Sequence, residues 1–375
     1  MKKVVIVMPA WNEAENISRM VVELVDGEFP KINAQMHLLV VDNYSKDETK
    51  KIVDEASKKR KNLHFIQQGD KSGLGWAYVK GFRYAVDVLK ADAVMEMDAD
   101  FQHPPRFVQP MIEAYLNGAD YVIGSRYIKG GSIPKEWELT RKLMSYFGNL
   151  YARVVLTKFS IHDMTTGFRL TKVKGVLDQI DLENVMELTR FAYKIDLLYQ
   201  SLKHAKNVKE VPLQFESRTN EKSKFKIKEM IVSYKTVMIL GIKDKIRFIK
   251  FGIVGFLGFL VNFFFLRFFR SLELPETLSW FFSTELAIIN NYVLNNVWTF
   301  KSDQIAGLKN TIFKFLQFNL TSAGALLIQS IFGPLGVKLV GVEYDGLVLA
   351  FVVLFLVMPY NYTMYNLVIW RRKRG

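Results

Sequence analysis

Short apolar runs and amphipathic segments alternate along residues 4–123. Five runs rich in β-branched or other apolar side chains are typical of buried parallel strands: Val4–Met8, His37–Val41, Leu63–Gln67, Ala93–Met97 and Tyr121–Ile123. The segments between them repeat apolar residues at helical spacing, which predicts four helices: Glu13–Val25, Lys46–Arg60, Gly75–Leu89 and Pro105–Asn117. Alternating strands and helices predict an α/β fold, with a mostly parallel sheet covered by helices on both faces.

Two later segments, Arg141–Leu156 and Phe225–Ile249, interleave apolar residues with basic ones. Either a helix that faces the core or a helix that lies on a membrane surface would account for the first pattern. The second segment directly precedes a long apolar run, so we expect it to lie at a membrane interface.

Four longer apolar segments follow, and each holds about the 20 residues that a helix needs to cross a bilayer. They are Phe248–Phe269, Leu278–Phe300, Phe313–Val340 and Leu347–Trp370. Gly333-Pro334 interrupts the third segment. We expect the asparagines of the second segment to form hydrogen bonds between helices, as polar residues in membrane helices do. These are Asn290, Asn291, Asn295 and Asn296.

The charges beside these segments predict their orientation. Basic residues precede the first span, separate the second from the third and end the chain at Arg371–Arg374, whereas the other two connections carry acidic residues. By the positive-inside rule, both termini face the cytoplasm. The run Val4–Met8 is too short for the apolar core of a signal peptide. We therefore expect a multi-pass protein of the cell membrane with a cytoplasmic domain at 1–224, an amphipathic interface helix at 225–247 and four membrane helices at 248–375.

The 375 residues carry a formal net charge of +14 and include no cysteine. A basic chain can bind nucleic acid, anionic lipid headgroups or anionic substrates. The apolar segments favour lipids and anionic substrates, and we expect no nucleic-acid partner. The missing cysteines exclude disulfides, a thiol nucleophile and a cysteine metal site.

Polar clusters follow the predicted strands, at the edge where parallel sheets bind ligands. The most informative is Asp98-Ala99-Asp100, with Gln102 close behind. Two carboxylates that project to the same side of a strand end repel each other unless a cation lies between them. An Asp-x-Asp pair can also be a solvated acidic turn, but its place at the end of an apolar strand favours a Mg²⁺ or Mn²⁺ site.

The run Met97–Pro105 resembles the metal-binding segment of dolichyl-phosphate mannose synthases, which are inverting glycosyltransferases with the GT-A fold. Further motifs of that family appear in the expected order over about residues 1–230. They are Met8-Pro9-Ala10-Trp11-Asn12-Glu13, Val40–Thr49, Gly73-Leu74-Gly75, Gly124-Ser125-Arg126-Tyr127, Thr166-Gly167-Phe168 and Arg218 with Ser223-Lys224. The four-span region resembles, more loosely, the small membrane domain that accompanies archaeal synthases of this type.

The resemblance implies roles for individual residues. It assigns the nucleotide to Pro9, Trp11, Glu13, Asp42, Asp98 and Ala99, and the metal to Asp98, Asp100 and Gln102. It assigns the acceptor phosphate to Arg126, Arg141, Ser145, Arg218 and Ser223, since guanidinium groups match phosphate oxygens. Asp100 and the three arginines are the expected catalytic residues. Asn43 and Trp11 depart from the usual Asp and Tyr, which leaves the nucleotide base open.

These features predict a metal-dependent, inverting transfer of mannose from GDP-mannose to dolichyl or polyprenyl phosphate. The nearest alternative is a glucosyltransferase that uses UDP-glucose and the same lipid phosphate. An alternative of another class is a lipid transporter or assembly scaffold with a vestigial cytoplasmic domain, which the intact Asp98, Asp100 and Arg126 disfavour.

Overall fold

The computed structural model describes residues 1–69, 73–217 and 227–370. The chain forms two compact units, Met1–Gly241 and Ile242–Gly375, called here the sheet unit and the helical unit. Helix α7 (Ile227–Ser271) begins in the first unit and continues into the second. The division therefore falls inside the predicted interface segment 225–247. Whether that segment lies on a membrane stays a prediction.

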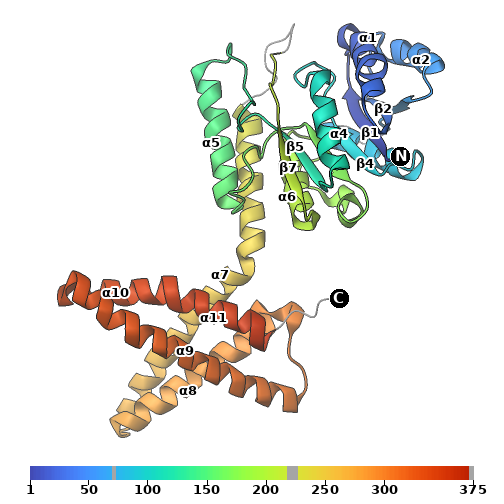
Figure 1. The fold of residues 1–375 in the computed structure, drawn as a ribbon. Coiled ribbons are helices and arrows are strands. Elements are labelled where there is room, and N and C mark those ends of the chain that lie inside the picture. The colour runs from blue at the N-terminus through green and yellow to red at the C-terminus, as the bar shows by residue number, and fades with distance from the viewer. Residues whose placement is uncertain (70–72, 218–226, 371–375) are drawn as a thin grey trace. The chain divides into compact units, whose positions relative to one another are not determined.

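The sheet unit contains a seven-stranded sheet in the order β3-β2-β1-β4-β6-β5-β7 (Figure 1). The strands are β1 (Lys3–Ala10), β2 (Gln35–Asp42), β3 (Leu63–Gln67), β4 (Ala93–Glu96), β5 (Tyr121–Ser125), β6 (Arg169–Lys172) and β7 (Val208–Pro212). Only β6 pairs antiparallel, with β4 and β5, so the mostly parallel sheet is confirmed. All five predicted strands are present. The hydrophobic pattern missed β6 and β7, which are short and carry charged residues.

Helices cover both faces of this sheet, as predicted. They are α1 (Ala14–Val21, continued by a π-helical turn at Val22–Glu28), α2 (Thr49–Lys59), α3 (Leu74–Asp87), α4 (Val108–Leu116), α5 (Leu139–Val155) and α6 (Tyr193–His204). Successive residues of a strand point to opposite faces. Val4 and Ile6 therefore pack into one core with α1, α2 and α4, while Val5 and Val7 pack into the other with α3 and α6.

Helix α5 corresponds to the first amphipathic segment and lies beside the start of α7 (Figure 1). Its small inner surface includes Asn149 and Ala152, and Tyr151 lies 4.8 Å from Tyr234 of α7 between ring centroids. Its larger apolar side chains are exposed: Leu139, Leu143, Tyr146, Phe147, Leu150 and Val154. The apolar stripe thus faces outward, which favours an interfacial helix over a core-facing one.

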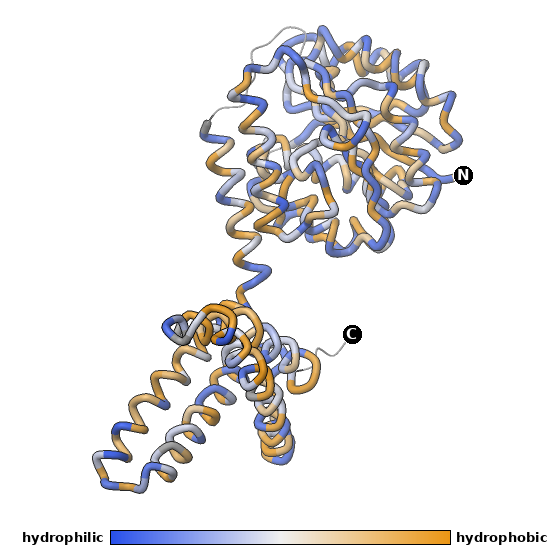
Figure 2. Tube along the Cα trace, turned by 60° about the vertical axis from the view of Figure 1, so that its left-hand side comes forward, coloured by the Kyte–Doolittle hydropathy of each residue, from blue (hydrophilic) through white to orange (hydrophobic). Residues whose placement is uncertain are grey.

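The helical unit holds the rest of α7, then α8 (Glu276–Leu294), α9 (Leu308–Val340), α10 (Asp345–Val352) and α11 (Met358–Met364), with π-helical turns at Asn295–Thr299, Val353–Val357 and Tyr365–Ile369. Phe300 and Trp370 stack at 4.5 Å in its aromatic core. Asn296 accepts hydrogen bonds from Trp370 Nε1 (2.9 Å) and the Ile305 backbone N–H (2.8 Å), so for this residue the expected hydrogen bonds between segments are present. Asn290 Nδ2, Asn291 Oδ1 and Asn295 Oδ1 are buried without a hydrogen-bond partner among the described residues, so the expectation does not hold for these atoms. Hydrophobic residues predominate along these helices (Figure 2).

Within the described residues, three helices are long and apolar enough to cross a membrane: Lys228–Ser271, Leu308–Val340 and Leu347–Ile369. The second of the four expected spans, Leu278–Phe300, falls on α8 and its π-helical turn and is not among them. Glu285 and the four asparagines lower its hydropathy. The expected interruption at Gly333-Pro334 is absent, because α9 continues through Pro334. The side of the membrane on which the termini lie stays a prediction.

Candidate active site

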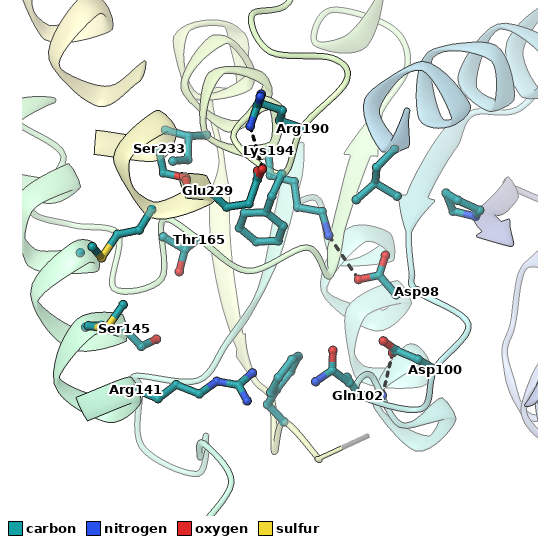
Figure 3. A pocket seen from close by; sticks show the side chains of 18 of the residues that line it. Asp98, Asp100, Gln102, Arg141, Ser145, Thr165, Arg190, Lys194, Glu229 and Ser233 are labelled. Atoms are coloured by element: carbon teal, nitrogen blue, oxygen red, sulfur yellow. Dashed lines mark hydrogen bonds and ion pairs between the residues drawn. The ribbon is translucent and has the colours of Figure 1, made fainter. Parts of the chain in front are cut away.

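A cavity of about 1220 Å³ opens at the carboxyl ends of the parallel strands in the sheet unit (Figure 3). It is lined by the loops after β1, β4 and β5, by α5 and by the first turns of α6 and α7. Ten of the predicted site residues line it together: Pro9, Trp11, Glu13, Asp98, Ala99, Asp100, Gln102, Arg126, Arg141 and Ser145. The predicted Arg218 and Ser223 lie outside the described residues.

Asp42 is the one described site residue that does not line this cavity. It is fully buried, and both carboxylate oxygens accept a hydrogen bond from the backbone N–H of Ser45, at 3.3 and 3.1 Å. Its neighbour Asn43 lines the cavity instead. The structure therefore assigns Asp42 to the turn after β2, and a direct contact with a nucleotide base stays a prediction.

The loops after β1 and β2 are joined by hydrogen bonds between two motifs that are distant in sequence. The backbone N–H of Asn12 donates to Ser45 Oγ (2.9 Å), and that of Glu13 donates to Thr49 Oγ1 (2.9 Å). Asn12 and Tyr44 adopt positive φ angles of 55° and 54°. This locked pair of turns fixes the wall that carries Pro9, Trp11 and Glu13.

Asp98 is held at the floor of the cavity by two side chains. Lys194 Nζ lies 3.2 Å from Oδ2 (Figure 3). The Tyr78 hydroxyl donates to Oδ1 at 3.1 Å. Burial alone would raise the pKa of Asp98, but the charge of Lys194 and the hydrogen bonds from Lys194 and Tyr78 hold it below the usual value. Asp98 is therefore ionised and fixed in orientation at neutral pH.

The segment after Asp98 forms a tight loop. Asp100 Oδ1 accepts a hydrogen bond from the backbone N–H of Gln102 (3.1 Å), and Phe101 between them has a φ of 60°. His103 is buried, which lowers its pKa to about 4, so its neutral Nδ1 accepts the Asp98 backbone N–H at 3.3 Å. The loop thereby presents the oxygens of Asp98, Asp100 and Gln102 to one cavity. No cluster of three or more acidic or histidine side chains suited to a metal occurs among the described residues.

Arg126 lies in the cavity wall with its charge already paired. Its guanidinium contacts both oxygens of the fully buried Asp163, at 2.7 and 2.8 Å, and donates to Thr165 Oγ1 at 2.7 Å. Burial would raise the pKa of Asp163, but Arg126 holds it below the usual value. Because Asp163 compensates much of this charge, a contact of Arg126 with the acceptor phosphate stays a prediction.

Arg141 and Ser145 stand one helical turn apart on α5 and face the cavity (Figure 3). The guanidinium of Arg141 lies 3.8 Å from the centre of the Trp137 ring, and Ser145 Oγ lies 2.6 Å from the Tyr127 hydroxyl. These contacts hold a cation and a hydroxyl on the wall that α5 forms.

The sequence analysis missed Lys194, Arg190, Glu229 and Ser233, all of which line the same cavity. The glycines of two motifs were the available signal. A Cβ on Gly73 would lie 2.6 Å from the Thr189 Cα, and one on Gly167 would lie 2.9 Å from Lys194 Cε. These glycines let the segment that carries Arg190 and Lys194 approach the site. The glycines indicated a close approach, but the sequence could not say which segment approaches.

Known proteins resemble the chain along most of its length. The family model Glycosyl transferase family 2 matches residues 5–178, and the model GtrA/DPMS, transmembrane domain, matches residues 250–370. A dolichol-phosphate mannosyltransferase of Pyrococcus furiosus is 32% identical over 361 residues, which cover 95% of this chain and 97% of that protein. A polyprenol monophosphomannose synthase of Mycolicibacterium smegmatis is 34% identical over 58% of this chain and 78% of its own length.

Among solved structures, glucosyl-3-phosphoglycerate synthase from Mycobacterium tuberculosis gives a TM-score of 0.44 at 17% identity. The match covers 64% of this chain and 79% of that one. A likeness at this level does not extend to function.

Proposed function

Because the chain belongs to the dolichol-phosphate mannosyltransferase family of glycosyltransferases, we propose that it transfers mannose from GDP-mannose to dolichyl or another polyprenyl phosphate. One observation carries this proposal beyond the family. A single cavity combines the carboxylates of Asp98 and Asp100 with the cation of Arg141 on α5. Carboxylates suit a divalent cation that would bind the diphosphate of a nucleotide sugar, and a guanidinium suits the phosphate of the acceptor.

The oxygens of Asp98, Asp100 and Gln102 would hold a divalent cation. Carboxylate and amide oxygens are the ligands that Mg²⁺ and Mn²⁺ prefer, and the open cavity leaves room for diphosphate oxygens and water in the remaining positions. When bound, the cation would offset the charge that builds up on the departing nucleoside diphosphate. Lys194 keeps Asp98 ionised and oriented for this role.

The nucleotide is proposed to bind against the loop after β1. Pro9, Trp11 and Glu13 line that part of the cavity, and Trp11 is 51% exposed. Asp42 supports this wall through the turn at Ser45. The family and this wall suit a guanine nucleotide or a uracil nucleotide, and the experiment below separates the two.

The acceptor needs no general base. A phosphate monoester has its second pKa near 6 and is largely dianionic at neutral pH, so its own oxygen is the nucleophile. The residues of this chain must therefore align the phosphate behind the anomeric carbon and offset its charge. Arg141 and Ser145 are placed for this on α5. Attack opposite the leaving group inverts the anomeric centre.

Transfer assays with purified full-length protein test the proposal. Radiolabelled GDP-mannose and UDP-glucose are supplied separately with a polyprenyl phosphate, with Mg²⁺, with Mn²⁺ and with excess chelator. We expect labelled lipid only from GDP-mannose and only with a cation. Labelled lipid from UDP-glucose alone would contradict the donor, and full activity in chelator would contradict the cation. The same assay addresses the transporter alternative, which the membership of an enzyme family already disfavours.

A further inference from the structure

Arg190 places in the cavity a guanidinium that belongs to none of the family motifs. It lies in the segment before α6, its side chain is 29% exposed, and it lines the same cavity as Arg141. Its NH1 lies 2.9 Å from Glu229 Oε1 in the first turn of α7 (Figure 3). Its Nε lies 3.8 Å from Glu187 Oε2. Arg190 therefore sits in the catalytic cavity, with acidic side chains as its present partners.

The partner carboxylate is only half satisfied. Glu229 Oε2 is buried and has no hydrogen-bond donor among the described residues, although Oε1 is paired with Arg190. A carboxylate held in this way compensates the charge of Arg190 without the two-oxygen geometry that makes such pairs strong. By contrast, Asp163 engages Arg126 through both oxygens and is fully buried. The Arg190–Glu229 pair is therefore the one that a competing anion can displace more easily.

The position of Arg190 relative to α5 suggests which anion competes. Arg141 and Ser145 come from α5, whereas Glu229 and Ser233 come from α7, and all four line the cavity with Arg190 (Figure 3). Between these helices the lining is apolar and includes Met144, Met230 and Tyr234. A ligand with a phosphate head and an apolar chain suits this combination of cations and apolar side chains.

We propose that Arg190 is a further ligand of the acceptor phosphate. Glu229 pairs with Arg190 in the free enzyme and gives up this contact when the phosphate enters. This inference rests on the proposed function, because it concerns the same acceptor. A dianionic phosphate outcompetes one carboxylate for a guanidinium, since it offers twice the charge and can accept two parallel hydrogen bonds. Glu229 thus makes acceptor binding depend on the charge of the ligand. The shared chemistry is an anionic phosphate group, either on a lipid or as free inorganic phosphate.

This role differs measurably from a purely structural ion pair. If the pair only braces α7 against α6, removing either partner has the same effect. If Arg190 binds the phosphate and Glu229 competes for it, the two changes act in opposite directions on acceptor affinity. The experiment therefore compares Arg190→Gln, Arg190→Lys and Glu229→Gln in the full-length protein in detergent. Arg83→Gln is the matched control, because it breaks an exposed ion pair with Glu183 outside the cavity.

Transfer from GDP-mannose to farnesyl phosphate gives kcat and the KM of each substrate, and calorimetric titration gives binding of farnesyl phosphate and of inorganic phosphate without a donor. We expect Arg190→Gln to weaken farnesyl phosphate binding and raise its KM about tenfold, with the KM of GDP-mannose unchanged. Arg190→Lys should weaken farnesyl phosphate binding less than Arg190→Gln does. Glu229→Gln should bind farnesyl phosphate at least as tightly as the wild type.

Weaker binding in both Arg190→Gln and Glu229→Gln, or no change in either arginine variant, would overturn the proposal. If Arg190→Gln fails to fold, Arg190→Lys and Glu229→Gln still give opposite directions or refute them. Binding of inorganic phosphate that responds as strongly as binding of farnesyl phosphate would identify free phosphate as the ligand and overturn the lipid acceptor. Failure of the proposed function looks different, because the wild type would then bind farnesyl phosphate without transferring mannose to it.

Discussion

Among the described residues, buried charged side chains lie in the sheet unit, whereas the buried polar side chains of the helical unit are amides and hydroxyls. In the sheet unit, the buried Asp163 accepts hydrogen bonds from Arg126 and from the backbone of Thr166. In the helical unit, Asn262 Oδ1 and Asn295 Oδ1 are buried without a donor among the described residues. The first unit uses its buried charges to fix positions around a cavity. The second keeps few charges and carries amides on apolar helices, as membrane helices do.

The two units also differ in where their exposed apolar residues lie. In the sheet unit the largest group of them lies on α5, where an interface with lipid is expected. In the helical unit they occur along the helices, with Phe259 and Phe264 more than 60% exposed. Apolar surface of this extent is stable only against lipid or protein. The comparison suggests that chemistry resides in the sheet unit and that the helical unit anchors it, and the predictions below test this division.

The largest expected effect follows the loss of Asp100. Asp100→Ala removes one of the carboxylates proposed to hold the cation, so kcat/KM for mannose transfer should fall by about a thousandfold or more. The matched change Glu285→Ala, on α8 of the helical unit, should leave kcat/KM within about threefold, because that residue lies outside the cavity. Equal losses in the two variants would contradict the division between the units.

Separating the units should have a smaller effect on the chemistry. A chain that ends after Asp244 retains all residues of the sheet unit. It should fold, bind nucleotide and transfer mannose to a short soluble prenyl phosphate within about tenfold of the full chain, because the lost spans contribute mainly proximity to lipid. With long polyprenyl phosphate in vesicles, the truncated chain should lose more of its transfer activity than with the short acceptor. If the truncated chain binds nucleotide but transfers nothing to the short acceptor, the helical unit takes part in catalysis.

The sequence was most informative where one rule acts locally. Runs such as Val4–Met8 predicted their strands because a buried parallel strand must be apolar over its whole length. The hydrophobic pattern did not predict strand β6 (Arg169–Lys172), because polar side chains of this strand are buried by partners far away in sequence. The sheet and its cavity could therefore be predicted, whereas the antiparallel insertion of β6 could not.

The same limit applied to the site. Asp98 and Asp100 could be found because two carboxylates at a strand end form a local pattern. Lys194 could not, since it lies 96 residues from Asp98 in sequence and no nearby motif marks it. The partner of Arg126 was missed for the same reason, because Asp163 follows 37 residues later. Tertiary packing, rather than any local preference, determines both pairs.

Breaking one ion pair in each unit sharpens the comparison of stability. Asp163→Asn leaves Arg126 buried without its counter-charge, which should cost about 3 kcal/mol and lower the melting temperature by about 6–12 °C. Asp303→Asn breaks the pair with Arg247 (2.9 Å) in the helical unit, where both side chains are more exposed, and should cost about 1 kcal/mol. Thermal unfolding of the full chain in detergent measures both. A larger shift for Asp303→Asn would reverse the contrast.

The smallest expected effect concerns acid. All five histidines lie in the sheet unit. His37 on β2 lies beside His64 on β3, with Nδ1 and Nε2 2.9 Å apart. Burial, together with the charges of His64 and Lys3, lowers the pKa of His37 from 6.5 to about 4. Between these values the unfolded chain binds more protons than the folded one, so this contribution to stability is complete above pH 6.5 and is lost as the pH falls towards 4.

Because His37 is partly open to solvent, we expect a contribution of about 1 kcal/mol rather than the full value of the shift. The free energy of unfolding of His37→Gln should therefore depend less on pH between 6.5 and 4 than that of the wild type. His204→Gln, a change of an exposed histidine at the end of α6, is the control and should keep the wild-type slope. Denaturant unfolding of the truncated sheet unit at several pH values measures this difference without the helical unit. Identical slopes in His37→Gln and the wild type would show that this histidine pair does not contribute to the acid sensitivity of the sheet unit.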